Sequence, residues 1–362
     1  MTLHTRACEL FGVAHPVVQT GMGWVAGARL VAATANAGGL GILAAATMTF
    51  DELEAQVAEV KSRTDKPFGV NLRADQDDFE RRVDLLIREG VRVASFARAP
   101  GKKGIAQLKE AGVITMPTIG MVKHARKVAD WGVDAVIAQG GEGGGHTGSV
   151  PTSLLLPRVV DAVGDRCVVL GAGGFCDGRG LAAALAWGAD GVAMGTRFLL
   201  TRESTVPDEV KARYLAAGIL DTVVTTAVDG YPQRVVRTEF INGLERAGFF
   251  GRLVAAIRHG LAFSSMTGTS LGELVREGQA MRANSGLTWP QVLMGANAPM
   301  YTKATLVDGQ LDSGILPTGQ VAGAIDELPH VSDLVAEIIA EAEQTLDRMA
   351  RVERRPVASA TA

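Results

Sequence analysis

The chain has 362 residues, 47% of them hydrophobic, so it can bury a large core, and barrel domains with insertions reach this length. A formal net charge of −3 gives no reason to expect a nucleic acid or an anionic membrane as partner. The three cysteines are scattered, which argues against a zinc site and a disulfide framework. The N-terminus does not resemble a signal peptide, and no apolar run reaches ~18 residues, so neither secretion nor a membrane span is expected. These features predict a cytoplasmic protein without a bound metal.

Short apolar runs alternate with segments of helical spacing from residue 16 to about residue 198. The predicted strands are residues 17–20, 41–43, 68–71, 93–97, 113–117, 135–138, 167–171 and 191–194. Helices are expected between them at residues 28–37, 51–63, 79–89, 103–111, 122–131, 152–163 and 178–187. Thr49 and Glu52 have the spacing of a capping box at the start of the second helix. Eight such units predict an α/β fold, a closed (β/α)8 TIM barrel.

The alternation of strands and helices ends after residue 198. Residues 206–303 contain helical patches, such as 209–216 and 252–259, which predict a mainly helical insertion that covers the C-terminal face of the barrel. The chain is therefore divided into a barrel at 1–205, the insertion at 206–303, and a return to the barrel at 304–362. The last part holds a glycine-rich loop and a final helix at 331–349.

The segment Gln139-Gly-Gly-Glu-Gly-Gly-Gly-His146-Thr-Gly148 follows the sixth predicted strand, and six of its ten residues are glycine. A loop with so few side chains cannot hold itself by packing, so we expect a bound ligand to order it. His146 stands at the C-terminal end of a barrel strand, where barrel enzymes place catalytic groups. It is the candidate acid or base, and the alternative is a structural histidine.

Glycine-rich loops also follow the seventh and eighth predicted strands, as Gly171-Ala-Gly-Gly-Phe175 and Gly195-Thr-Arg197. In barrels of this kind these two positions commonly bind a phosphate, through backbone N–H groups. Two tight turns without a ligand are the alternative. Residues 143–148 also match a dinucleotide fingerprint, but Pro151 separates the last glycine from the next helix, which argues against that interpretation.

Basic residues gather after the fourth and fifth predicted strands. They are Arg98, Lys102, Lys103, Lys123 and His124. A solvated loop is the ordinary explanation for such charges. Cations at this rim would also suit the phosphates of an acyl carrier such as coenzyme A, so these residues are candidates for substrate binding.

Several motifs, taken together, indicate a known protein family. They are Gln19-Thr-Gly-Met-Gly-Trp24, Asn36-Ala-Gly-Gly39, Pro67-Phe-Gly-Val-Asn71, the glycine loop with His146, Gly173-Gly-Phe-Cys-Asp-Gly178 and Met194-Gly-Thr-Arg-Phe198. Over nearly its whole length the chain resembles the nitronate monooxygenase superfamily, the former 2-nitropropane dioxygenases. That resemblance implies an FMN-dependent (β/α)8 barrel with a helical second domain.

The resemblance also implies roles for single residues. His146 falls on the family's catalytic histidine. The implied FMN contacts are Gly21, Met22, Gly23, Asn71, Thr118, Gln139 and Gly144 around the ring, and Ala172, Gly173, Gly174, Gly195 and Thr196 at the phosphate. Thr118 stands where some flavin-binding relatives carry a lysine, and Pro317-Thr318 stands where others have Ser-Ala, in the loop that approaches the ring. Both departures weigh against the nitronate activity, and Thr318 joins the candidate substrate contacts.

A narrower resemblance is to the IpdC-type enzymes of steroid-degrading actinobacteria. It rests on the glycine loop, on Gln19-Thr-Gly-Met-Gly-Trp-Val-Ala-Gly-Ala-Arg29 and on Trp289-Pro-Gln-Val-Leu-Met294. It implies α,β-dehydrogenation of a hydroxy-methyl-oxo-octahydroindene carboxyl-CoA thioester, with NAD as eventual electron acceptor.

Three other functions stay open from the sequence. The first is a nitronate monooxygenase that oxidises a small nitronate with O₂. The second is a flavin-dependent enoyl reductase, which works in the opposite direction, and the third is a phosphate-ligand binding barrel without turnover. The sequence also leaves a homodimer open.

Overall fold

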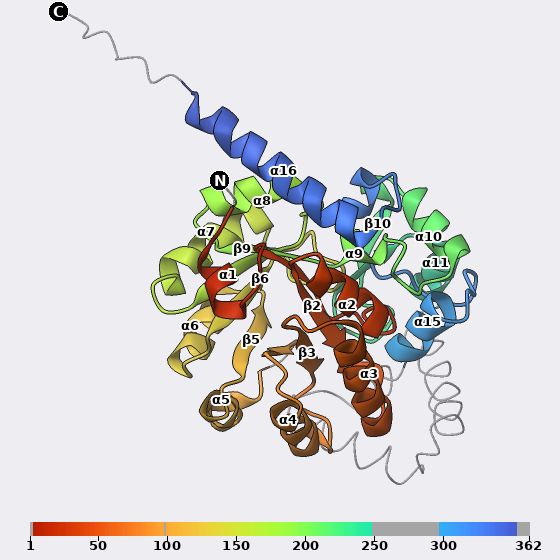
Figure 1. The fold of residues 1–362 in the computed structure, drawn as a ribbon. Helices are drawn as coiled ribbons and strands as arrows, with labels where there is room; N and C mark the ends of the chain where they lie inside the picture. The colour runs from red at the N-terminus through yellow and green to blue at the C-terminus, as the bar shows by residue number, and fades with distance from the viewer. Residues whose placement is uncertain (1–2, 98, 248–296, 353–362) are drawn as a thin grey trace, which may run out of the picture.

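A closed barrel of eight parallel strands is the centre of the molecule (Figure 1). The computed structural model describes residues 3–97, 99–247 and 297–352. The barrel strands are β1 Val17–Gln19, β2 Leu40–Ala44, β3 Gly69–Leu72, β4 Val93–Phe96, β5 Ile114–Ile119, β6 Ala135–Gln139, β8 Val168–Ala172 and β9 Gly191–Met194. Closure comes from the pairing of β1 with β9, so the predicted TIM barrel is confirmed.

Helices cover the outside of the barrel, one after nearly every strand. They are α2 Ala28–Asn36, α3 Phe50–Arg63, α4 Phe79–Arg88, α5 Gly101–Glu110, α6 Val122–Asp130, α7 Thr152–Val163, α8 Gly178–Ala186 and the short α9 Thr196–Leu199, with the 3-10 turn η1 Ala45–Thr47 after β2. The predicted capping box starts α3, since Glu52 N–H donates to Thr49 Oγ1 at 3.3 Å and Thr49 N–H donates to Glu52 Oε2 at 2.7 Å.

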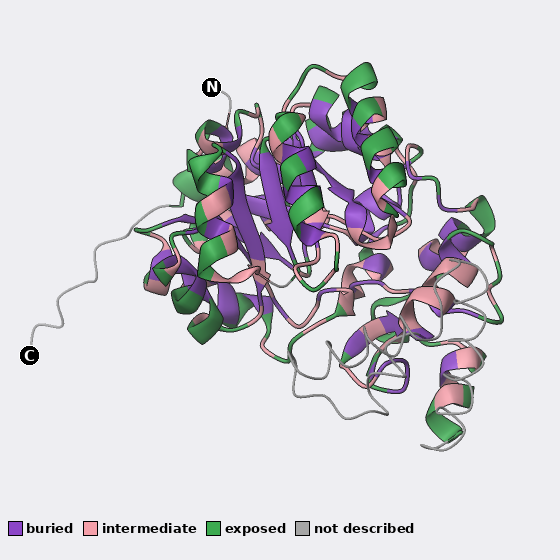
Figure 2. Ribbon diagram, turned by 90° about the horizontal axis from the view of Figure 1, so that it is seen from below, coloured by how far each residue is buried: buried purple, intermediate pink, exposed green. Residues whose placement is uncertain are grey.

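The strands are buried on both faces (Figure 2). One set of side chains, which includes Val18, Ile42 and Met116, fills the barrel interior, and the alternate set packs under the helices. An unpredicted helix, α1 Arg6–Phe11, contributes Phe11 to the interior cluster. Because α1 precedes β1, it closes the end of the barrel where the strands begin and leaves the other end for ligands.

The insertion contains a β-hairpin as well as the expected helices. Its described elements are α10 Asp208–Leu215, η2 Ile219–Asp221, β10 Thr222–Thr225, β11 Gln233–Val236, α11 Glu239–Arg246 and α15 Asn297–Leu306. The second strand of the hairpin also pairs with β7 Gly145–His146, so the insertion and the glycine loop share a three-stranded antiparallel sheet. The helical patch expected at 252–259 and the motif at 289–294 lie outside the described residues.

The C-terminal helix α16 Val331–Ala350 follows η3 Gln320–Ala324 and packs along α8 (Figure 1). The two helices approach so closely that a Cβ atom on Gly178 would lie 2.3 Å from Ile338 O. Gly178 N–H also donates to Glu341 Oε2 at 2.7 Å. The return of the chain to the barrel therefore depends on a glycine at the first position of α8.

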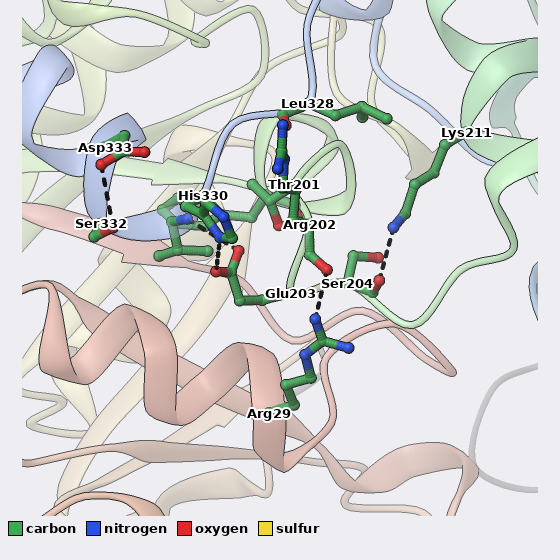
Figure 3. Close-up of polar contacts among 12 residues, drawn as sticks. Arg29, Thr201, Arg202, Glu203, Ser204, Lys211, Leu328, His330, Ser332 and Asp333 are labelled. Carbon is green, nitrogen blue, oxygen red and sulfur yellow. Dashed lines mark hydrogen bonds and ion pairs between the residues drawn. The ribbon is translucent and has the colours of Figure 1, made fainter.

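Polar contacts join the end of the barrel to the insertion and to α16 (Figure 3). Glu203 accepts from the N–H of Val331 at 3.0 Å and from His330 Nδ1 at 2.9 Å, so it caps the start of α16. Lys211 of α10 is buried and donates to Ser204 O at 2.8 Å. Burial lowers the pKa of this lysine. Within the described residues, no helix is both long and apolar enough to span a bilayer.

Candidate functional site

The glycine loop after β6 is ordered by contacts from the protein itself. Arg234 of β11 donates from Nη2 to Gly141 O at 2.8 Å, and Gln139 Nε2 donates to His146 O at 2.9 Å. The carboxylate of Glu142 accepts from both the N–H and the hydroxyl of Thr152, at 2.9 and 2.8 Å. Protein side chains therefore hold the loop at several points, one of them Arg234 from the insertion, and a bound flavin beside the loop stays a prediction.

His146 lies on β7, opposite Gln233 of β11. Its Nε2 is 2.7 Å from Oδ2 of Asp229, and the ring of Tyr231 meets the imidazole edge-on with centroids 5.9 Å apart. The histidine side chain is 61% exposed, whereas Asp229 is buried. The imidazole is thus both held by a partner and open to an incoming molecule, as an acid–base group needs to be.

Asp229 and Tyr231 were missed by the sequence analysis. They come 83 and 85 positions after His146, in the turn of a hairpin that sequence periodicity did not indicate. The Asp229-Gly-Tyr-Pro232 run after Val228 has turn composition and could have suggested the hairpin.

Polar side chains line the end of the barrel where the strands stop. Asn71, Thr118 and Gln139 are half-buried there, on the same strand faces as the interior residues below them. Asn71 Nδ2 donates to Ser95 Oγ at 3.3 Å, so buried Ser95 of β4 belongs to this group although the sequence analysis did not name it. A planar ligand with polar edges would meet both hydrogen-bond donors and acceptors on this surface.

The loops after β8 and β9 are adjacent, since these strands pair through Ala172 and Ala193. Gly173 and Gly174 have φ values of 93° and 83°, a conformation that other residues rarely adopt. None of the hydrogen bonds among the described residues uses the N–H of Gly173, Gly174, Gly195 or Thr196 as donor. Backbone donors without protein acceptors, in two neighbouring glycine-rich loops, fit the phosphate of FMN.

Some glycines assigned to the flavin have a packing role. A Cβ atom on Gly21 would lie 2.5 Å from Asn71 Cβ, and one on Gly23 would lie 2.9 Å from Thr47 Cγ2. A Cβ atom on Gly144 would lie 2.4 Å from the carbonyl carbon of Thr318. Packing therefore accounts for glycine at these positions. A Cβ atom on Gly195 would lie 3.5 Å from Met22 Sδ, which places Met22 beside the loop after β9.

Thr318 is buried at the junction of two loops. Its hydroxyl lies 3.2 Å from Thr196 Oγ1, and Gly319 N–H donates to the same Thr196 oxygen at 3.0 Å. Tyr214 of α10 donates its hydroxyl to Pro317 O at 3.1 Å. The loop at 317–319 is thus held between the insertion and the proposed phosphate loops, rather than exposed to a substrate.

The candidate basic residues are placed at one end of the barrel. Lys102 and Lys103 lie in the first turn of α5, and Lys123 and His124 in the first turn of α6, all exposed. Both helices begin where strands end, so these basic residues share the end of the barrel that carries His146. Arg98 lies outside the described residues.

A hollow at the opposite end of the barrel is lined by Arg6, Lys109 and Arg166. Each of these cations has an aspartate partner at 2.8 to 3.8 Å. Their charge is already neutralised, so the hollow offers no evident anion site. In the described parts of the chain, no three His, Cys, Asp or Glu side chains come together as metal ligands would.

Comparisons with known proteins agree with this geometry. A family model described as nitronate monooxygenase matches residues 4–80 and 76–341. The chain is 60% identical over 348 residues to a Rhodococcus jostii protein named (3aS,4S,5R,7aS)-5-hydroxy-7a-methyl-1-oxo-octahydro-1H-indene-4-carboxyl-CoA dehydrogenase, a match that covers 96% of this chain and 98% of the relative. A Mycobacterium tuberculosis protein of the same name is 61% identical, with 94% and 97% covered.

Among solved structures, FabK from Thermotoga maritima superposes with a TM-score of 0.78. The two chains are 35% identical, and the match covers 96% of this chain and 99% of the other.

Proposed function

The chain belongs to the nitronate monooxygenase family, and from that premise we propose that it is an FMN-dependent dehydrogenase of a steroid-derived CoA thioester. The substrate class is the hydroxy-methyl-oxo-octahydroindene carboxyl-CoA named for its two relatives. The observation that carries the proposal is their identity of 60% and 61% over at least 94% of this chain. NAD is the proposed final electron acceptor, steroid catabolism the proposed process and the cytoplasm the proposed compartment.

The residues at the open end of the barrel have separate tasks in this proposal. The N–H groups of Gly173, Gly174, Gly195 and Thr196 would hold the phosphate of FMN. Asn71, Thr118 and Gln139 would face the ring system, which supplies two-electron redox chemistry when it is bound.

His146 has the task of proton removal. A thioester carbonyl makes the neighbouring α-hydrogen acidic, and the exposed imidazole can take that proton while its other nitrogen is held by the protein. The hairpin pairs with the glycine loop and the loop at 317–319 lies beside that hairpin, so both would help to restrict water at the reacting carbons.

The exposed cations of the α5 and α6 first turns would contact the phosphates of the CoA carrier. Cations at a helix N-terminus are unfavourable to the helix itself, by about 0.3–1 kcal/mol each, so their presence in both helices suits an external anion.

Anaerobic mixing of the purified yellow enzyme with candidate substrates tests the proposal. The octahydroindene carboxyl-CoA thioester should bleach the flavin absorbance, and an alkyl nitronate should not. Bleaching by the nitronate alone would replace the proposal with nitronate monooxygenase activity, which is the activity in the name of a more distant relative, the probable nitronate monooxygenase of Staphylococcus saprophyticus, 33% identical. Protein that purifies without flavin would indicate a binding barrel instead.

A further inference from the structure

Asp229 is built into its turn in a way that leaves one carboxylate oxygen for His146. Its Oδ1 accepts from the N–H of Tyr231 at 3.1 Å, and its Oδ2 lies 2.7 Å from His146 Nε2. The residue is 3% exposed, so both contacts are sheltered from bulk solvent. The carboxylate therefore has one oxygen for the backbone of its own hairpin and one for the imidazole.

The carboxyl group of Asp229 is ionised at neutral pH. Burial, the largest effect, raises its pKa. The hydrogen bond and charge of His146, with the side chain of Gln233 and the Tyr231 N–H, together outweigh burial and lower the pKa below its ordinary value. An ionised carboxylate has acceptors and no proton to donate. The hydrogen in the short contact must therefore be on Nε2 of His146.

A neutral imidazole carries one hydrogen, so a hydrogen on Nε2 leaves the lone pair on Nδ1. Among the described residues, Nδ1 of His146 has no hydrogen-bond partner, and the side chain is the exposed member of the pair. Tyr231 meets the ring edge-on and so limits its rotation. Nδ1 is thus the nitrogen that is free to receive a proton from a bound substrate.

We propose that Asp229 is a positioning residue that holds His146 in the Nε2–H tautomer, so that Nδ1 takes the proton from the substrate. In that step the C–H bond of the α-carbon breaks, the proton forms an N–H bond with Nδ1, and the electron pair stays on the substrate as an enolate. The imidazolium formed is stabilised by the carboxylate of Asp229. The inference rests on the proposed function for the identity of the acid–base step, but the tautomer itself does not depend on the substrate.

A simple tether is the alternative role for this pair. In that case the contact would serve only to join β7 to the hairpin, and the tautomer of His146 would not depend on Asp229. The pairing of β7 with β11 already joins these segments through the backbone. A tether alone therefore predicts a loss of stability in a variant, and no change in tautomer.

Nitrogen-15 NMR of the histidine-labelled holoenzyme, without substrate, tests the inference directly. The chain has six histidines, and His146→Gln identifies the signals of His146 by their loss. The wild-type spectrum should show a protonated Nε2 and an unprotonated Nδ1. A protonated Nδ1 would overturn the inference, even if the enzyme proved to act on another substrate.

Asp229→Asn is the matching variant, because the amide keeps the volume and the acceptor for the Tyr231 N–H but can also donate to Nε2. We expect a mixed or reversed tautomer and a fall in kcat of about 10²- to 10⁴-fold with unchanged flavin content. Asp221→Asn, which changes a turn-capping aspartate in the same insertion, is the control and should do neither. An unchanged tautomer in Asp229→Asn would leave the tether as the explanation.

Discussion

Gly144→Ala should weaken FMN binding through the loop at 317–319, which lies between the glycine loop and the proposed phosphate loops. The added Cβ would lie 2.4 Å from the carbonyl carbon of Thr318 and 2.5 Å from the nitrogen of Gly319, and both are backbone atoms. Ordinary contact begins at 3.4 Å, so the loop at 317–319 must retreat by about 1 Å. The hydrogen bond from Gly319 N–H to Thr196 Oγ1, now 3.0 Å long, would then be lost.

The loss should amount to about 1–3 kcal/mol, from one or two hydrogen bonds and the strain of overpacking. If all of it reaches the phosphate loops, the FMN dissociation constant rises by about 5- to 150-fold. Flavin fluorescence during titration of the apoprotein measures that constant. Gly148→Ala is the control on the same loop, because its Cβ would stand at an ordinary 3.7 Å from Gly120 O. Equal FMN affinity in the two variants would refute the reasoning.

His146→Ala should lower kcat by about 10²- to 10⁴-fold with little change in flavin content, and full activity would assign the base elsewhere. Lys102→Glu should raise KM for the CoA thioester by up to about fivefold in steady-state kinetics, because it replaces a proposed phosphate contact with a negative charge. Lys66→Glu, at the other end of the barrel, should leave KM unchanged. Gly178→Ala should lower Tm by about 2–6 °C in calorimetry, because its Cβ would meet the backbone of α16, and an unchanged Tm would contradict that packing. Burial raises the pKa of Asp229, but its contacts with His146 lower it overall, so its carboxylate stabilises the fold above the ordinary pKa and loses that contribution as pH falls. The Tm difference between wild type and Asp229→Asn should therefore shrink from pH 7 to pH 3, and a constant difference would argue against an ionised Asp229.

The barrel could be predicted because its signals are local. Each strand is a short apolar run and each helix has its own periodicity, so residues such as Val136 and Leu181 indicate their elements without reference to distant parts of the chain. The Thr49 capping box likewise needs only its neighbours. Closure into a barrel followed from the count of strand–helix units, and the pairing of β1 with β9 confirms it.

The contacts around His146 could not be predicted, because they are not local. The hairpin strands Thr222–Thr225 and Gln233–Val236 have only four residues each, too few for periodicity to distinguish strand from loop. Arg234 and Asp229 reach the glycine loop only through the antiparallel register of that hairpin with β7. The assigned FMN contacts remain predictions from the family resemblance, supported by the donors in the loops after β8 and β9.

The pairing of β7 with β11 has a consequence for how such enzymes can be recombined. His146 belongs to the glycine loop after β6, but its strand partner and its carboxylate neighbour come from the insertion. The polar side chains that we propose to face the flavin come from the barrel strands. A chimera that exchanged the insertion between two relatives would therefore leave the imidazole with the host barrel and replace the carboxylate beside it. The side chains proposed to face the flavin would stay with that imidazole, so the proton acceptor and its carboxylate partner are inherited on separate stretches of one gene.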